Sequence, residues 1–70
     1  MLKASKLKSK IIERETTIEQ LSLKLDIDRA TFYRKLKNNS FYVHEVETIA
    51  KELRLTNREI NDIFFAWKGA

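Results

Sequence analysis

The sequence contains no cysteine and no proline, and its single glycine is Gly69. Without cysteine the chain has no disulfide framework, no thiolate nucleophile and no zinc site built on cysteine. A glycine-rich phosphate-binding loop is also absent, because such a loop needs several glycines close together. The stability of the fold must therefore come from the packing of its side chains.

Chain length and hydrophobic content limit the class of protein. A chain of 70 residues can bury one core, so we expect one domain over residues 1–70. Apolar residues make up 43% of the chain and charged residues 34%. This is too hydrophobic for a disordered tail, and the apolar residues are too evenly spread for a membrane span. The basic N-terminus lacks the apolar segment of a secretory signal, so we expect an unprocessed cytoplasmic protein with no membrane contact.

The residue types that support catalysis or metal binding are isolated from one another in the sequence. His44 is the only histidine, and no cysteine is present to complete a ligand set. The closely spaced carboxylates, Asp26 with Asp28 and Glu45 with Glu47, lie at expected helix ends, where acids cap a helix or favour its dipole. The serines have no nucleophile elbow or positioned base around them. We therefore expect no enzyme activity, no metal, no cofactor and no small-molecule effector.

Charge is distributed unevenly along the chain. Residues 1–14 hold five basic side chains and one acid, residues 15–28 hold one basic side chain and four acids, and residues 29–40 hold four basic side chains and no acid. A polyanion is the natural partner of such basic blocks, because each cation that neutralises a phosphate also releases condensed counterions. The alternative is that both blocks are solvated faces without a partner.

Apolar residues recur at helical spacing, and no stretch has the alternation and turn chemistry of a hairpin. We expect an all-α fold of five helices. The first covers about residues 3–14, with Leu7 and Ile11 on one face. The second follows Thr17, which forms a capping box with Gln20, and it breaks near Asp26.

The remaining three helices are bounded by equally local signals. Asp28 is a suitable N-cap for the third helix, and the loop at residues 38–40 ends it. The fifth helix begins after Thr56, in a second capping box with Glu59, and runs toward Trp67. Between them the fourth helix ends near Arg54 and Leu55, and its expected buried stripe consists of Val43, Val46, Ile49, Ala50 and Leu53.

The second and third expected helices are joined by about three residues, which is the spacing of a helix-turn-helix. The segment from Ile18 to Leu36 resembles the motif of the phage repressor and Cro family, the lambda repressor-like DNA-binding domains. Its packing positions hold Leu21, Ser22, Leu25, Ile27, Phe32 and Leu36. The resemblance covers about residues 4–65 and implies a five-helix bundle that binds DNA. The family usually has glycine where this chain has Asp26, and aspartate tolerates the expected left-handed backbone better than most residues.

One face of the third helix is suited to the major groove of DNA. Phe32 and Leu36 are expected to point inward. The residues that share the outward face are Arg29, Ala30, Tyr33, Arg34 and Lys37. Arginine can make two hydrogen bonds to guanine, and small apolar groups can meet the thymine methyl. The family resemblance implies Arg29, Ala30 and Arg34 as base-contacting residues, with Tyr33 reaching a base or a phosphate. Thr31, Lys35 and Lys37 are secondary candidates.

Phosphate contacts are expected from two places beside this helix. The amides at the start of the second helix, around Thr17 and Ile18, suit an anion. Many family members have glutamine at the position of Ile18, so a side-chain contact is lost there. The loop of Asn38, Asn39 and Ser40 is the second place. Lys3, Lys6 and Lys10 can add a clamp independent of sequence, and the alternative is that they are simply solvated.

The C-terminal aromatic residues suggest a homodimer. Phe41, Tyr42, Phe65 and Trp67 are more aromatic surface than one small core can absorb, and exposed apolar surface usually marks a partner site. We expect an interface centred on Phe65 and Trp67 with Phe64 contributing. The alternative is that these residues pack back onto the first helix. Leu23, which lies off the buried stripe of its helix, is a weaker interface candidate.

The sequence therefore predicts a transcriptional regulator of phage or mobile-element type that binds a double-stranded operator as a dimer. Two other functions remain open. One is a protein-interaction module on the same fold, such as an antitoxin or a phage protein that captures a host factor. The other is an architectural or excision factor that bends DNA.

Overall fold

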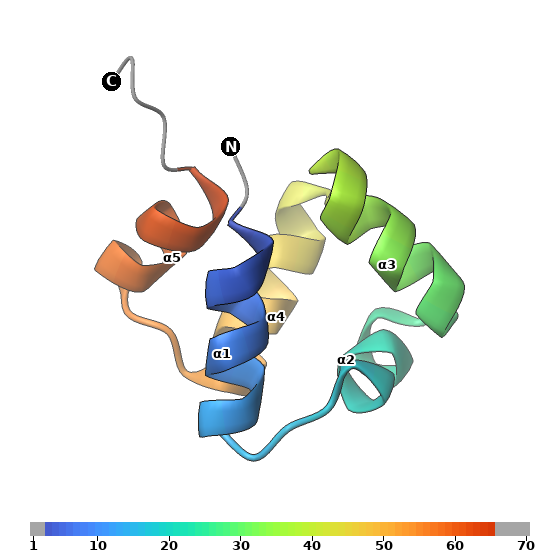
Figure 1. The fold of residues 1–70 in the computed structure, drawn as a ribbon, viewed down its shortest axis with the longest axis horizontal. Helices are drawn as coiled ribbons and strands as arrows, with labels where there is room; N and C mark the ends of the chain where they lie inside the picture. Colours follow the sequence, from blue (N-terminus) through green and yellow to red (C-terminus); the bar gives the residue numbers. More distant parts are fainter. Residues whose placement is uncertain (1–2, 66–70) are drawn as a thin grey trace.

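A computed structural model of the protein describes residues 3–65, and these residues form five α-helices and no strand. In Figure 1, α1 lies in front of α4, α5 lies on one side of α1, and α2 and α3 lie on the other. α1 packs against α5, and α2 packs against both α3 and α4. The helices are α1 (Ala4–Glu13), α2 (Ile18–Leu25), α3 (Arg29–Asn38), α4 (Val43–Leu53) and α5 (Asn57–Phe64). The expected all-α fold is confirmed.

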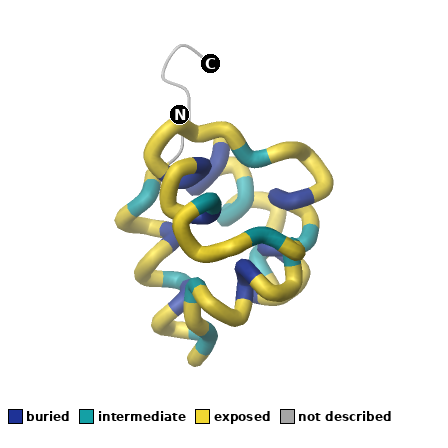
Figure 2. Tube along the Cα trace, turned by 90° about the vertical axis from the view of Figure 1, so that its right-hand side faces the viewer, coloured by how far each residue is buried: buried dark blue, intermediate teal, exposed yellow. Residues whose placement is uncertain are grey.

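One hydrophobic core joins all five helices. Each helix supplies inward residues to it, and Figure 2 shows these buried positions recurring along the inner side of the chain. The buried apolar residues are Leu7, Ile11, Leu21, Phe32, Leu36, Val46, Ile49, Ala50, Leu53, Ile63 and Phe64. The first and last helices also meet through the backbone, because the Lys3 N–H donates to the Ile63 carbonyl at 2.7 Å. Among residues 3–65 no helix is both long and apolar enough to cross a membrane.

Three helix starts, those of α2, α3 and α5, are fixed by the local caps that the sequence predicts. The Thr17 hydroxyl accepts from the Gln20 N–H at 3.1 Å, and the Gln20 side chain returns to the Thr17 N–H. Thr56 and Glu59 form the same reciprocal pair at α5. The Asp28 carboxylate accepts from the backbone N–H three residues later at 2.7 Å. Each cap satisfies amides that a helix N-terminus leaves without a partner.

Within residues 3–65, four residues adopt a left-handed backbone, and each ends a helix or follows its end. Their φ angles are 55° at Glu15, 60° at Asp26, 53° at Asn39 and 53° at Arg54. This conformation brings Cβ close to the carbonyl oxygen, a cost that aspartate and asparagine reduce by local hydrogen bonding. The left-handed backbone expected at Asp26 is confirmed, and Arg54 adopts it without such a side chain.

A buried ion pair joins α3 to α4. The Lys35 ammonium lies 3.0 Å from Glu45 Oε1, and the same oxygen accepts from the Tyr42 N–H at 2.9 Å. Lys35 Nζ also lies 4.1 Å from the centre of the Tyr42 ring. Burial alone would raise the pKa of Glu45, but the hydrogen bonds from Tyr42 and Lys35 outweigh burial and hold that pKa below its ordinary value. Glu45 is therefore charged in the folded protein at neutral pH.

Two details of the expected helices are different in the structure. Val43 was expected in the buried stripe of α4, but it is 72% exposed because it occupies the first turn, beyond the edge of the core. The helix α5 ends at Phe64, short of the expected approach to Trp67, and Trp67 lies outside the described residues.

The left-handed Arg54 gives a first prediction. Glycine adopts this conformation without strain, so we expect Arg54→Gly to raise the free energy of unfolding by about 1 kcal/mol. Asp26→Gly should gain less, because aspartate already tolerates the conformation. Chemical denaturation measures both changes. Lys51→Gly, on the same turn of α4 but with helical backbone, is the control and should lose about 1 kcal/mol. If Arg54→Gly lowered the free energy of unfolding as much as Lys51→Gly does, the prediction would be contradicted.

The ion pair between α3 and α4 gives a second prediction. We expect Glu45→Gln to lower the free energy of unfolding by about 3 kcal/mol, because Lys35 is left buried without its anionic partner. The pKa of Glu45 is lowered on folding, so its contribution is complete above the ordinary value of 4.5 and is lost as the pH falls through the folded value. Denaturation curves of wild type and Glu45→Gln should therefore converge in acid. Glu47→Gln, an exposed neighbour, should match wild type at every pH.

Candidate nucleic-acid interface

The outer face of α3 is free of the core. Arg29, Ala30, Tyr33, Arg34 and Lys37, the set expected to face DNA, are all exposed. The opposite face is fixed by buried side chains, among them Phe32 and Leu36. The helix therefore presents three cations and one aromatic ring outward from a rigid support.

The turn before α3 determines where its first residues lie. Ser22 is buried, and its hydroxyl donates to the Ile18 carbonyl at 2.8 Å. Burial of this small side chain therefore leaves no polar atom without a hydrogen-bond partner. The Ile27 N–H donates to the Ser22 carbonyl at 3.0 Å across the turn. The hydroxyl and the backbone N–H of Thr31 lower the pKa of Asp28, so this cap is charged at neutral pH. Thr31, a secondary phosphate candidate, is partly buried and takes part in this cap.

The expected phosphate contacts lie at both ends of the motif. Thr17 is exposed at the N-terminus of α2, and Ile18 beside it is partly buried. Asn38, Asn39 and Ser40 are all exposed at the C-terminal end of α3. The left-handed Asn39 lets the Ser40 N–H donate to the Lys35 carbonyl at 3.0 Å. This hydrogen bond closes the C-terminal end of α3.

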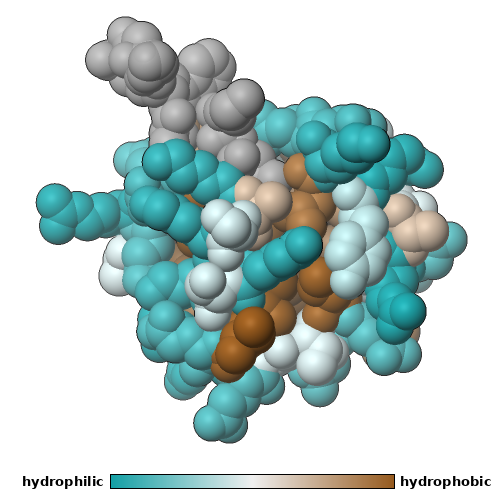
Figure 3. All heavy atoms as spheres, viewed as in Figure 1, coloured by the Kyte–Doolittle hydropathy of each residue, from teal (hydrophilic) through white to brown (hydrophobic). Residues whose placement is uncertain are grey.

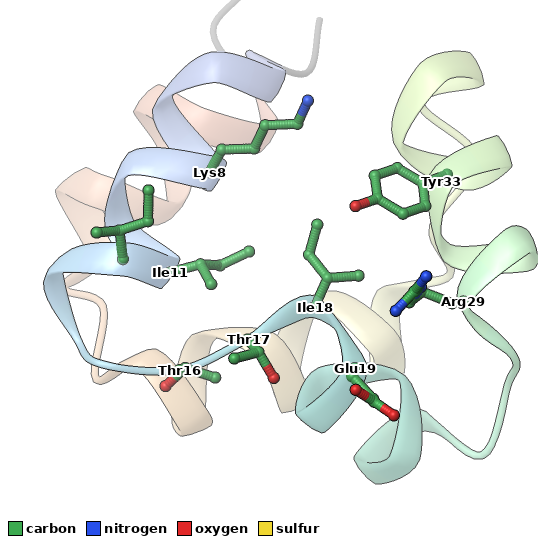
Figure 4. A pocket seen from close by; sticks show the side chains of 9 residues that line it. Lys8, Ile11, Thr16, Thr17, Ile18, Glu19, Arg29 and Tyr33 are labelled. Atoms are coloured by element: carbon green, nitrogen blue, oxygen red, sulfur yellow. The ribbon is translucent and has the colours of Figure 1, made fainter.

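An open depression, here called the α1–α3 notch, lies beside the outer face of α3. It has a volume of about 450 Å³, and its lining includes Lys8, Ile12, Thr17, Ile18, Arg29 and Tyr33. In Figure 4, Lys8 extends from α1 and Tyr33 from α3 toward the gap between these helices, with Ile18 between them. Figure 3 shows apolar surface in the hollow between the two helices, with polar surface around it.

The other lysines of α1 face α5 and are paired there. Lys6 pairs with Asp62, and the Lys10 ammonium lies 2.6 Å from Glu59 and 3.4 Å from Glu13. The hydrogen bond to Glu59 raises the pKa of Lys10, and the same bond lowers the pKa of Glu59. The structure therefore does not bring Lys10 to the phosphate-binding position expected for it, because acids of α5 hold its side chain on another face.

Two further candidates, Lys35 and Phe64, are buried although they were expected at the surface. Lys35, a secondary phosphate candidate, is buried against Glu45 and does not belong to the exposed face. Phe64, a proposed contributor to a dimer interface, is 3% exposed because it packs in the core. Phe65 is 45% exposed, as an interface residue must be. Trp67 lies outside the described residues.

Sequence reasoning did not single out Lys8 or Ile12, although both line the α1–α3 notch. The helical period does separate them from Lys6 and Lys10, because residues one position after the inward Leu7 and Ile11 point to the opposite side from residues one position before. The helical period does not predict which of these two sides of α1 faces α3. Only the packing of α1 against α5 decides that Lys8 and Ile12 face the helix-turn-helix.

Comparison with known proteins agrees with this geometry. A sequence model of the Cro/C1-type HTH DNA-binding domain matches residues 6–65, which is most of the chain and includes all five helices except the first residues of α1. Searches among curated proteins and among solved structures gave no match. The chain therefore belongs to the Cro/C1-type helix-turn-helix family and is a DNA-binding domain.

Proposed function

We propose that the protein is a sequence-specific transcriptional regulator, of phage or mobile-element type, that places α3 in the major groove of a double-stranded operator. The observation that supports this most is the outer face of α3, which has Arg29, Arg34 and Lys37 exposed and no acid within residues 29–40. In this proposal Arg29 and Arg34 contact guanine, and Ala30 lets the helix approach a thymine methyl.

Contacts at the two ends of the motif hold this helix in register. Thr17 and Ile18 lie at the start of α2, and the exposed Asn39 and Ser40 follow the end of α3. Such contacts to phosphate position the protein without selecting a sequence. The whole chain acts as one domain in the cytoplasm, needs no cofactor or effector, and regulates by occupying DNA.

We further propose that the protein binds its operator as a homodimer. A single α3 spans too few base pairs to specify an operator, and related repressors place two such helices one turn of DNA apart. The exposed Phe65 directly after α5 supports an interface there, together with Trp67. Phe64 contributes by packing beneath this surface, since its own side chain is buried.

A protein-interaction module is the second candidate function, and two exposed apolar side chains favour it. Ile12 and Leu23 are each 76% exposed, on α1 and α2. Salt dependence separates the two functions, because operator binding weakens steeply with added salt and favours one duplex over random DNA. Binding restricted to a protein partner, with no preference among duplexes, would contradict the regulator proposal.

The proposed base contacts give a third prediction. We expect Arg34→Ala to cost about 1–3 kcal/mol at one base position and to relax the preference there. Lys37→Ala should weaken all duplexes about equally, because a phosphate contact holds no sequence information. Selection from random duplexes with wild type and both variants measures this. Identical sequence profiles for wild type and Arg34→Ala would rule out Arg34 as a base contact.

The proposed dimer gives a fourth prediction. We expect Phe65→Ser to shift sedimentation toward the monomer and to weaken binding to a two-half-site operator far more than binding to one half-site. For wild type, the selected operators should contain half-sites about 10–10.5 base pairs apart. Val43→Ser removes an exposed apolar side chain from α4, where no interface is proposed, and should leave the dimer intact. A wild-type protein that occupies its selected site as a monomer would refute the proposed interface.

A further inference from the structure

The α1–α3 notch borders the proposed base contact Arg29 and adds side chains of α1 that no proposed base contact uses. Arg29 and Tyr33 line it from α3, Lys8 lines it from α1, and Ile12 and Ile18 are part of the same lining. It therefore continues the outer face of α3 toward the N-terminal helix. Glu19 is the single acid of the lining, against two cations.

The charge of Lys8 is available to a ligand. Lys6 and Lys10 form ion pairs with α5, whereas within residues 3–65 Lys8 has no acidic partner and is exposed. Figure 4 shows its amino group directed into the same gap as the Tyr33 hydroxyl, from the opposite helix. A cation and a hydroxyl donor that converge on one open space from two helices suit an anion.

The apolar part of the notch narrows the class of anion. Ile12 is 76% exposed and Ile18 is partly buried, and both are apolar side chains beside the two polar groups. A free inorganic anion gains nothing from apolar contact, whereas the nucleic-acid backbone alternates a charged phosphate with a largely apolar deoxyribose. Figure 3 shows this combination as an apolar hollow with polar surface around it.

We propose that the α1–α3 notch binds one phosphate of the DNA backbone, with Lys8 and Tyr33 as its ligands from opposite sides and Ile12 against the adjoining deoxyribose. The proposal rests on the proposed function, because α3 must lie in the major groove for a backbone strand to pass its flank. It assigns Tyr33 to phosphate and leaves base contact to Arg29, Ala30 and Arg34.

The test uses the selected operator with single neutral methylphosphonates placed at successive backbone positions. With wild type, neutralising one phosphate per bound protomer should weaken binding about tenfold, as expected for a lost hydrogen bond between charged groups. Lys8→Ala should weaken binding to every duplex and reduce the salt slope by about 1. It should also abolish the effect of that one methylphosphonate.

Two variants check the other assignments and one serves as a control. Tyr33→Phe should lose sensitivity to the same methylphosphonate and keep the base preferences of wild type. Ile12→Ser should weaken binding with an unchanged salt slope, because an apolar contact releases no counterion. Lys51→Ala removes an equal charge from the exposed side of α4 and should keep both the slope and the sensitivity of wild type.

The opposing outcomes are distinct. If Lys8→Ala unfolds at the same temperature as wild type and stays as sensitive to every methylphosphonate, the notch proposal is wrong. The proposal that the protein binds an operator would still hold. A changed preference at one base pair in Tyr33→Phe would also overturn it, by assigning Tyr33 to a base. Wild type that binds no duplex selectively would overturn the proposed function itself.

Discussion

The position of α3 depends on the burial of Phe32. This side chain is fully buried on the inner face of α3, and its ring meets Phe41 edge to face at 5.2 Å between centroids. Phe41 meets Phe64 in the same way at 6.2 Å. The three rings connect α3, through the loop that follows it, to α5. Edge-to-face pairs add to the burial of the rings, and a close-packed core resists displacement, so the outer face of α3 is held in one orientation.

Charge counted along the chain overstates the cationic surface that remains for DNA. The first 14 residues form a basic block, yet Lys6 and Lys10 are paired with acids of α5. Lys35 belongs to the second basic block, but it is buried with Glu45 because a buried ammonium needs a partner. Among residues 3–65, Lys8 and the cations on the outer face of α3 are the members of these blocks that lie beside the helix-turn-helix without an ion pair.

The features predictable from the sequence are those that local chemistry determines. Caps at Thr17, Asp28 and Thr56 involve residues three positions apart, and the left-handed Asp26 follows from the turn between α2 and α3. The helical period also identifies a buried face of each helix. The period does not predict which neighbouring helix packs against each side of that face. The burial of Lys35, the exposure of Val43 and the direction of Lys8 all depend on that tertiary choice, so sequence reasoning misplaced or missed them.

The helix α1 connects the two proposed surfaces of the molecule. One side of it lines the notch beside α3, and the other side packs on α5, which ends at the exposed Phe65. Its ion pairs with α5 lie at the surface, exposed for Lys6 and partly exposed for Lys10, and surface pairs contribute little to stability. The buried Leu7 and Ile63 belong to the shared core and stabilise this contact more strongly. In a dimer built on α5, apolar packing between α1 and α5 would therefore set the separation of the two α3 helices, and with it the spacing of half-sites.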